Sequence, residues 1–203
     1  YANDTTILAR LDSPSSCHLL QDDLTQVVDW SIANHLRFRH AKSAAMRFSA
    51  QMRVQPPCYS MSGTRAPVAT HLQILGVTLT PTLDFTIHVS SIVAKARRTL
   101  GFVTRVSRFC GPEGFRVLYT AMVLPRLEYC AAIWSPHQAH LSQRLEGVQR
   151  RATRTLLARS CWPLARSQSY EDRLRGVNWR SLDHRRVVAR VKFLCRLLDG
   201  SMC

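Results

Sequence analysis

Lysine and acidic residues are scarce in this sequence of 203 residues. Lysine supplies only 3 of the 28 basic side chains, and 13 acidic side chains oppose them, so the formal net charge at pH 7 is +15. The excess positive charge therefore lies almost wholly on arginine, whose planar guanidinium group pairs well with phosphate oxygens. Hydrophobic residues make up 46% of the chain, which is enough for a packed core and excludes a disordered tail.

The sequence also contains no closely spaced cysteine pair and no long apolar segment. The 7 cysteines are odd in number and widely spaced, and none belongs to a C-x-x-C pair, so the sequence predicts reduced thiols in an intracellular protein. No segment approaches the roughly 18 consecutive apolar residues that a membrane-spanning helix requires, so we expect no membrane as a partner.

The positive charge is concentrated in one half of the chain. Residues 1–94 carry 7 basic and 6 acidic residues, whereas residues 95–203 carry 21 basic and 7 acidic residues. If either half faces a polyanion, it is therefore the second.

The first half mixes helical and extended patterns. Ser13-Pro14 provides an N-cap followed by proline at the first helical position, and apolar residues then recur at helical spacing to about residue 36. Residues 45–49 alternate as a strand does, and Leu72 to Leu79 is expected to form another strand, which Pro81 ends.

From Asp84 onward the pattern is helical. A first apolar stripe steps along the chain by one, three or four residues and consists of Phe85, Val89, Ile92, Val93, Ala96, Leu100 and Val103. Gly111-Pro112 ends this helix and begins another, which we expect to kink or stop near Pro125. Two later stripes predict two more helices and consist of Leu141, Leu145, Val148, Ala152 and Leu156, and of Val187, Val191, Leu194 and Leu198. The sequence thus predicts an α+β chain that is mainly helical.

The first eight residues, YANDTTIL, place an Asn-Asp pair between an aromatic residue and an apolar run. A hairpin with carboxylates at its tip is how a polymerase palm presents metal ligands to a nucleoside triphosphate, because two Mg²⁺ ions clamp the attacking oxygen and the leaving pyrophosphate. Taken alone, so short a motif is more often a surface turn. It resembles the Y-A-D-D-T box of reverse transcriptases.

Five further segments resemble reverse transcriptases of non-LTR retrotransposons, the jockey-like LINE class, in the same order along the chain. They are HAKSAAMRFS (40–49), HLQILGVTLTPTLDFTIHV (71–89), LYTAMVLPRLEYCAAIWSP (118–136), RLEGVQRRATRTLL (144–157) and YEDRLRGVNWRSLDHRR (170–186). Six segments in the family's order are far more specific than any one of them.

The resemblance implies a partial polymerase palm in residues 1–82, built from a β-hairpin, a helix and short antiparallel strands. A thumb helix in residues 83–110 and a basic helical C-terminal region in residues 111–203 follow. It also implies that the chain begins inside the palm, without the fingers, the first half of the palm or an endonuclease domain. The implied partners are an RNA template and a DNA primer, paired as a duplex. The sequence does not fix the compartment of this intracellular protein, and the nucleus is compatible with a retrotransposon enzyme.

The resemblance places the catalytic metal ligands of the family at Asn3 and Asp4, with a third acid on an upstream strand that this sequence does not contain. Asn3 is neutral, and Mg²⁺ relies on carboxylates and phosphates because it loses its water reluctantly. Of three carboxylates only Asp4 remains to hold the metal. We therefore predict that this chain alone does not catalyse RNA-directed DNA synthesis, although the intact family does.

Two further positions match the family. Lys42 corresponds to a lysine near the departing pyrophosphate, where an ammonium group stabilises charge or donates a proton; the alternative is a solvated loop lysine. Gly76, in the Leu-Gly-Val segment, corresponds to a support for the primer end, where glycine lets a nucleic-acid backbone approach closely. The alternative there is an ordinary strand glycine or a bulge.

Basic side chains flank the apolar stripes of two predicted helices, and we expect them to contact nucleic-acid phosphates. They are Lys95, Arg98, Arg105 and Arg108 on the first helix, and Arg144, Arg150, Arg151 and Arg154 on the second. Such contacts position a duplex without reading its sequence. A solvated basic face is the alternative, and a non-catalytic nucleic-acid-binding protein is the alternative function. Trp134, Trp162 and Trp179 either stack on bases or, as is more common, seal the packing between helices.

Overall fold

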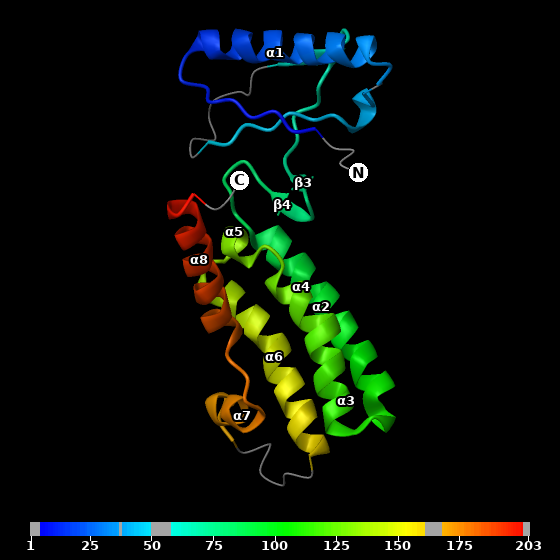
Figure 1. The fold of residues 1–203 in the computed structure, drawn as a ribbon, viewed down its shortest axis with the longest axis vertical. Coiled ribbons are helices and arrows are strands. Elements are labelled where there is room, and N and C mark those ends of the chain that lie inside the picture. The colour runs from blue at the N-terminus through cyan, green and yellow to red at the C-terminus, as the bar shows by residue number, and fades with distance from the viewer. Residues whose placement is uncertain (1–4, 37, 50–57, 161–167, 201–203) are drawn as a thin grey trace. The chain divides into compact units, whose positions relative to one another are not determined.

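The structure is a computed structural model that describes residues 5–36, 38–49, 58–160 and 168–200. The chain divides into two compact units, and each is described by itself. The first unit comprises residues 1–73 and 79–83, and the second, called the helical unit below, comprises residues 74–78 and 84–203. The described chain is α+β and mainly helical, as predicted, with two small two-stranded sheets (Figure 1). None of its helices is long and apolar enough to cross a membrane.

The first unit is built on helix α1 (Pro14–Ala33), which begins after Ser13 as predicted. Val28 is its buried apolar side chain, whereas Trp30 and Ile32 are exposed. Gln21 joins this helix to the next element, because its side-chain amide donates to the carbonyl of Ser60 and accepts from the Ser60 N–H, each at 2.9 Å.

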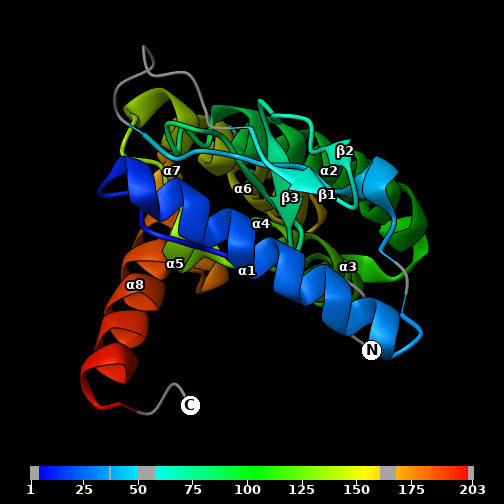
Figure 2. The same ribbon diagram turned by 90° about the horizontal axis from the view of Figure 1, so that it is seen from above.

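Extended structure in the first unit is short. Strands β1 (Ser60–Met61) and β2 (Thr64–Arg65) form an antiparallel hairpin, which Figure 2 shows together with α1. The predicted strand at 45–49 is wrong: Ala45 makes one isolated parallel bridge to Val68, and residues 46–49 form no strand. Residues 5–11 form no strand, and the rest of the predicted opening hairpin, residues 1–4, lies outside the described residues.

The predicted single strand from Leu72 to Leu79 is also wrong. It is a hairpin of two strands, β3 (Leu72–Ile74) and β4 (Val77–Leu79). Leu75 and Gly76 form the two-residue turn with φ angles of 46° and 82°. Both angles are left-handed, as in the tight turns that match the twist of a hairpin, and glycine adopts such a conformation without strain.

Helix α2 (Thr86–Val106) begins the helical part of the second unit and continues into the short 3₁₀ segment η2 (Ser107–Phe109). The predicted stripe is confirmed from Val89 to Val103, since these side chains are all buried, and Phe85 at the helix start is half-buried. His88 is buried on the same helix, although periodicity of apolar residues does not mark it.

Four short helical segments follow. They are α3 (Gly111–Leu118), the π-helical segment η3 (Tyr119–Val123), α4 (Leu124–Glu128) and α5 (Ala131–Trp134). The predicted irregularity near Pro125 appears as the widened π turn directly before it. Proline has no N–H to donate to the carbonyl four residues earlier, so a regular α-helical turn is interrupted there.

Three helices complete the chain: α6 (Ala139–Arg159), α7 (Tyr170–Val177) and α8 (Leu182–Leu198). The predicted stripe of α6 is buried. Helices α7 and α8 each begin at a serine, Ser169 and Ser181, whose hydroxyl accepts from the N–H three residues later. The stripe of α8 differs, because Val187, Val191, Leu194 and Leu198 are all exposed in the described chain.

Candidate nucleic-acid interface

Helices α2 and α6 pack against each other within the helical unit and carry the predicted phosphate-binding residues (Figure 1). The Arg144 guanidinium donates to the hydroxyl of Ser90 at 3.0 Å, and the Arg159 guanidinium donates to the carbonyl of Thr104 at 2.7 Å. Since both contacts join residues separated by 54 or 55 positions, the two helices run in the same direction. Their arginines are thereby presented on two neighbouring parallel rods.

The basic residues predicted on these two helices and on η2 are exposed: Lys95, Arg98, Arg105, Arg108, Arg144, Arg150, Arg151 and Arg154. No cationic side chain of α2 or α6 forms an ion pair with a carboxylate in the part of the chain that the structure describes. Phosphate groups of a nucleic acid would neutralise this unpaired positive charge on α2 and α6.

Acidic residues of the helical unit are instead paired on other helices. The ion pairs are Glu113 with Arg116, Glu128 with Arg185, Asp172 with Arg175, and Asp183 with Arg186. Glu146, which belongs to α6, turns inward: its carboxylate accepts from the Tyr170 hydroxyl at 2.5 Å and from the Asp183 N–H at 2.8 Å. The four ion-paired acids of the helical unit therefore lie outside α2 and α6, and Glu146 of α6 forms hydrogen bonds instead of an ion pair.

Arg97 is a residue of this surface that the sequence analysis did not select. Its guanidinium lies 4.0 Å from the position that a Cβ atom would occupy on Gly147 of α6, so it extends across the line of contact between the two helices. A Cβ atom at Gly147 would be in ordinary van der Waals contact with this guanidinium. The pairing of α2 with α6 is the information that would have identified Arg97, and no local pattern contains it.

Arg150 and Arg154 take part in a second grouping, on the side of α6 that faces α7. The guanidinium of Arg150 lies over the Tyr170 ring, 4.9 Å from its centroid, and that of Arg173 lies 5.9 Å from the same centroid. Burial first, and then the neighbouring charge of Arg154, lowers the pKa of Arg173. Arg173 was also missed, because it belongs to a different predicted helix.

Gly76 and Lys95 come together in an open cavity of about 390 Å³, although they are 19 positions apart. The Tyr129 hydroxyl donates to the carbonyl of Leu75 at 3.0 Å and holds the β3–β4 turn. A Cβ atom on Gly76 would lie 3.6 Å from the Tyr129 ring, in ordinary contact, so the backbone angle rather than space requires glycine here.

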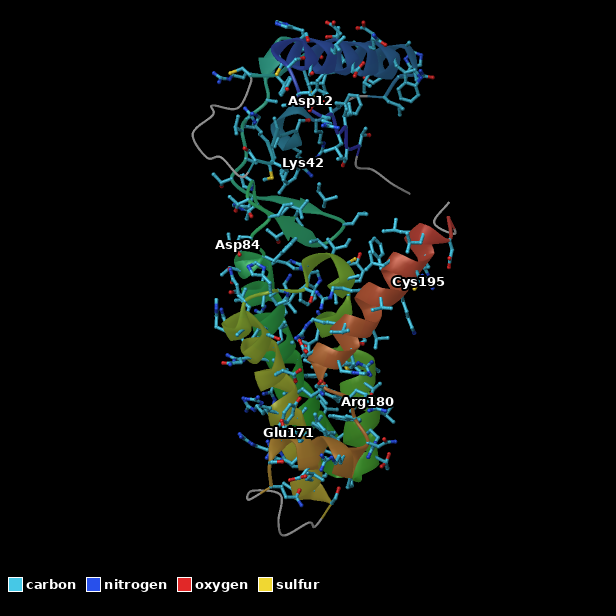
Figure 3. All side chains as sticks on the ribbon, turned by 90° about the vertical axis from the view of Figure 1, so that its left-hand side faces the viewer. Asp12, Lys42, Asp84, Glu171, Arg180 and Cys195 are labelled. Atoms are coloured by element: carbon cyan, nitrogen blue, oxygen red, sulfur yellow. The ribbon has the colours of Figure 1, made fainter. Side chains whose placement is uncertain are left out.

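The predicted catalytic residues are not assembled by the described structure. Asn3 and Asp4 lie outside the described residues, so the Mg²⁺ position at Asp4 has no geometry to test. Lys42 ends the 3₁₀ segment η1 (His40–Lys42), is exposed, and makes no ion pair with another described residue (Figure 3). Within the described ranges no three His, Cys, Asp or Glu side chains are grouped to hold a metal ion.

The two described tryptophans of the helical unit, Trp134 and Trp179, pack against other side chains of that unit. Trp134 is fully buried, its indole N–H donates to the carbonyl of Tyr129 at 2.6 Å, and its ring meets His88 edge to face. Trp179 stacks on Tyr119, with ring centroids 4.5 Å apart. The packing role is confirmed for these two, and Trp162 lies outside the described residues.

Comparison of the sequence with protein-family models finds no match, and comparisons with curated proteins and with solved structures find none either.

Proposed function

We propose that this chain is part of the RNA-directed DNA polymerase of a non-LTR retrotransposon, and that its helical unit binds the duplex of RNA template and DNA primer. In this proposal residues 1–82 belong to the palm, α2 is the thumb helix, and α6 lies beside it along the duplex. The polymerase assignment is based on the six sequence segments given above. The observation that supports duplex binding is the set of exposed arginines on α2 and α6 without carboxylate partners in the described chain.

Binding by such a surface is independent of sequence. Arginines on parallel helices reach phosphate oxygens from the outside of a duplex, and phosphate contacts fix its position without distinguishing its bases. Each contact releases a counterion, so the logarithm of the binding constant falls with the logarithm of the salt concentration by about 0.9 per contact. Five or six contacts predict a slope of about −5.

The test is a salt titration of the full chain with an RNA–DNA duplex. The double variant Arg98→Gln/Arg151→Gln removes one cation from each helix, so the slope should become less steep by about 2 units. The matched control is Arg10→Gln/Arg175→Gln, which removes the same net charge from arginines paired with Asp12 and Asp172. A flat titration of the parent chain, or equal losses in both variants, would contradict the proposal.

Catalysis is a separate matter. With the neutral Asn3 in place of the first acid, the proposed role of this chain is to hold the duplex and not to extend the primer. Primer extension by the purified chain with Mg²⁺ should give no product above background. Template-dependent synthesis by the chain alone would refute this part of the proposal.

The second candidate function is a non-catalytic nucleic-acid-binding protein, and the neutral Asn3 is the observation that favours it. Joining an upstream palm and fingers segment to a chain that carries Asn3→Asp distinguishes the two. Recovery of template-dependent synthesis supports the polymerase origin, whereas duplex binding without synthesis in the joined protein supports the second candidate.

A further inference from the structure

The cavity beneath the β3–β4 turn joins two predicted nucleic-acid contacts, Gly76 and Lys95, to residues that the duplex proposal does not use, among them His88 and Arg126. Its walls come from four parts of the helical unit: the turn, α2, the segment η3 with α4, and Tyr129. The lining residues are Gly76, His88, Ile92, Lys95, Ala121, Met122, Pro125, Arg126 and Tyr129.

Two cations face this one small volume. Lys95 comes from α2 and Arg126 from α4, 31 positions later, and neither forms an ion pair with a described residue. The described lining includes no carboxylate. Two uncompensated like charges in one cavity repel each other, and an anion between them removes that cost.

His88 also lines the cavity, although its side chain is buried. Its side chain is 4% exposed, and its Nδ1 accepts from the Thr78 N–H at 3.2 Å. The proton of the neutral ring is therefore on Nε2, which has no partner among the described atoms. Burial, and then the charge of Lys95, lowers the pKa of His88 and keeps the ring neutral near pH 7.

We propose that this cavity binds the terminal group of a phosphate monoester, with Lys95 and Arg126 as its charged contacts. A monoester carries a charge of about −1.5 to −2 at pH 7, which matches two cations better than the single charge of a phosphodiester does. A terminal phosphate also enters a cavity, whereas a backbone phosphate must allow the strand to continue on both sides. The group belongs either to a free nucleotide or to the 5′ end of a nucleic-acid strand.

The test compares one single-stranded oligonucleotide with and without a 5′-phosphate, by fluorescence anisotropy with the full chain. The parent chain should bind the phosphorylated strand about tenfold more tightly, which is the effect of one good charge-assisted contact. Arg126→Gln and Lys95→Gln should each bring this ratio close to one. Arg98→Gln, which removes a cation of α2 that does not line the cavity, should weaken both strands equally and preserve the ratio.

A second arm identifies the source of the phosphate. Displacement of the phosphorylated strand by a nucleoside monophosphate, but not by the nucleoside, supports the site and shows that free nucleotides fill it. Displacement only by a second phosphorylated strand supports the site and assigns it to strand ends. Equal affinity of the parent chain for the two strands, together with no displacement by the monophosphate, overturns the proposal. Far-UV circular dichroism of each variant confirms that it is folded.

The inference shares Lys95 with the proposed duplex surface, but the two proposals are tested by different measurements. Duplex binding is measured as the slope of affinity against salt concentration, with strands that end in hydroxyl groups. Binding in the cavity is measured as the ratio of the affinities for a strand with and without a 5′-phosphate. Either result stands when the other fails.

Discussion

Replacement of Arg159 by methionine is predicted to destabilise the helical unit by about 3 kcal/mol. The Arg159 guanidinium donates to the carbonyl of Ser107 at 2.9 Å, to the Ser107 hydroxyl at 2.7 Å and to the carbonyl of Thr104 at 2.7 Å. It also lies over the Phe115 ring, 5.0 Å from its centroid. One side chain of α6 thus caps the C-terminal end of α2, where backbone carbonyls have no partner within the helix and the helix dipole favours a cation.

The magnitude follows from these contacts. A hydrogen bond to a charged partner contributes about 1.5–3 kcal/mol when buried, and half-burial of Arg159 reduces this to about 1 kcal/mol for each of three bonds. Methionine retains the apolar stem and its packing on Phe115, so the loss is that of the guanidinium group alone. With a urea m value of about 1.5 kcal/mol/M for a unit of this size, the unfolding midpoint should fall by about 2 M.

The assay is urea unfolding of the full chain followed by tryptophan fluorescence. A background with Trp30→Phe and Trp162→Phe leaves Trp134 and Trp179 as reporters, both within the helical unit. The matched control is Arg154→Met, because Arg154 is an exposed arginine of the same helix, and it should change the midpoint by less than about 0.3 M. Equal shifts in the two variants would refute the capping argument.

Three other predictions use the same assay. Burial and the Glu146 contact raise the pKa of Tyr170 above 10, so the contribution of Tyr170 to stability is complete below pH 10 and is lost as the pH rises above 10. The free energy of unfolding should therefore fall between pH 9 and pH 11, and in Tyr170→Phe this fall should be smaller by about 1 kcal/mol. Glu146→Gln should lower the free energy of unfolding by about 2 kcal/mol, because the single amide oxygen cannot accept from both the Tyr170 hydroxyl and the Asp183 N–H. Glu113→Gln, in an exposed ion pair, should cost less than about 0.5 kcal/mol. Gly76→Ala should cost about 1 kcal/mol because of its positive φ, whereas Leu75→Asn should be neutral or stabilising; a loss for Leu75→Asn and none for Gly76→Ala would contradict the turn geometry.

Elements that depend on local sequence were predictable. The stripe of α2 was correct because a helix that buries one face repeats apolar residues every three or four positions. The irregularity before Pro125 was correct because a missing N–H has only local consequences. Ser13 was correct as the residue before α1, although its hydroxyl accepts no N–H of the helix; Pro14, with its fixed φ, suits the first helical position.

Features that depend on distant residues were not predictable. A continuous strand was expected from Leu72 to Leu79 because Leu75 is apolar, yet its side chain is 80% exposed at the tip of a turn. The joining of Gly76 to Lys95 in one cavity, and of Arg97 to Gly147, depends on how helices pack. Periodicity identifies the apolar face of a helix but not whether another element covers it, as the exposed stripe of α8 demonstrates.

The uncovered stripe of α8 has a practical consequence for handling the purified chain. In dilute buffer the net charge of +15 keeps copies of the molecule apart by mutual repulsion. Added salt shortens the range of that repulsion to about 3 Å at 1 M, while the hydrophobic attraction between exposed apolar surfaces persists or increases. High-salt washes that remove contaminating nucleic acid should therefore also promote aggregation of the protein, and a mild detergent or an arginine buffer should prevent this aggregation.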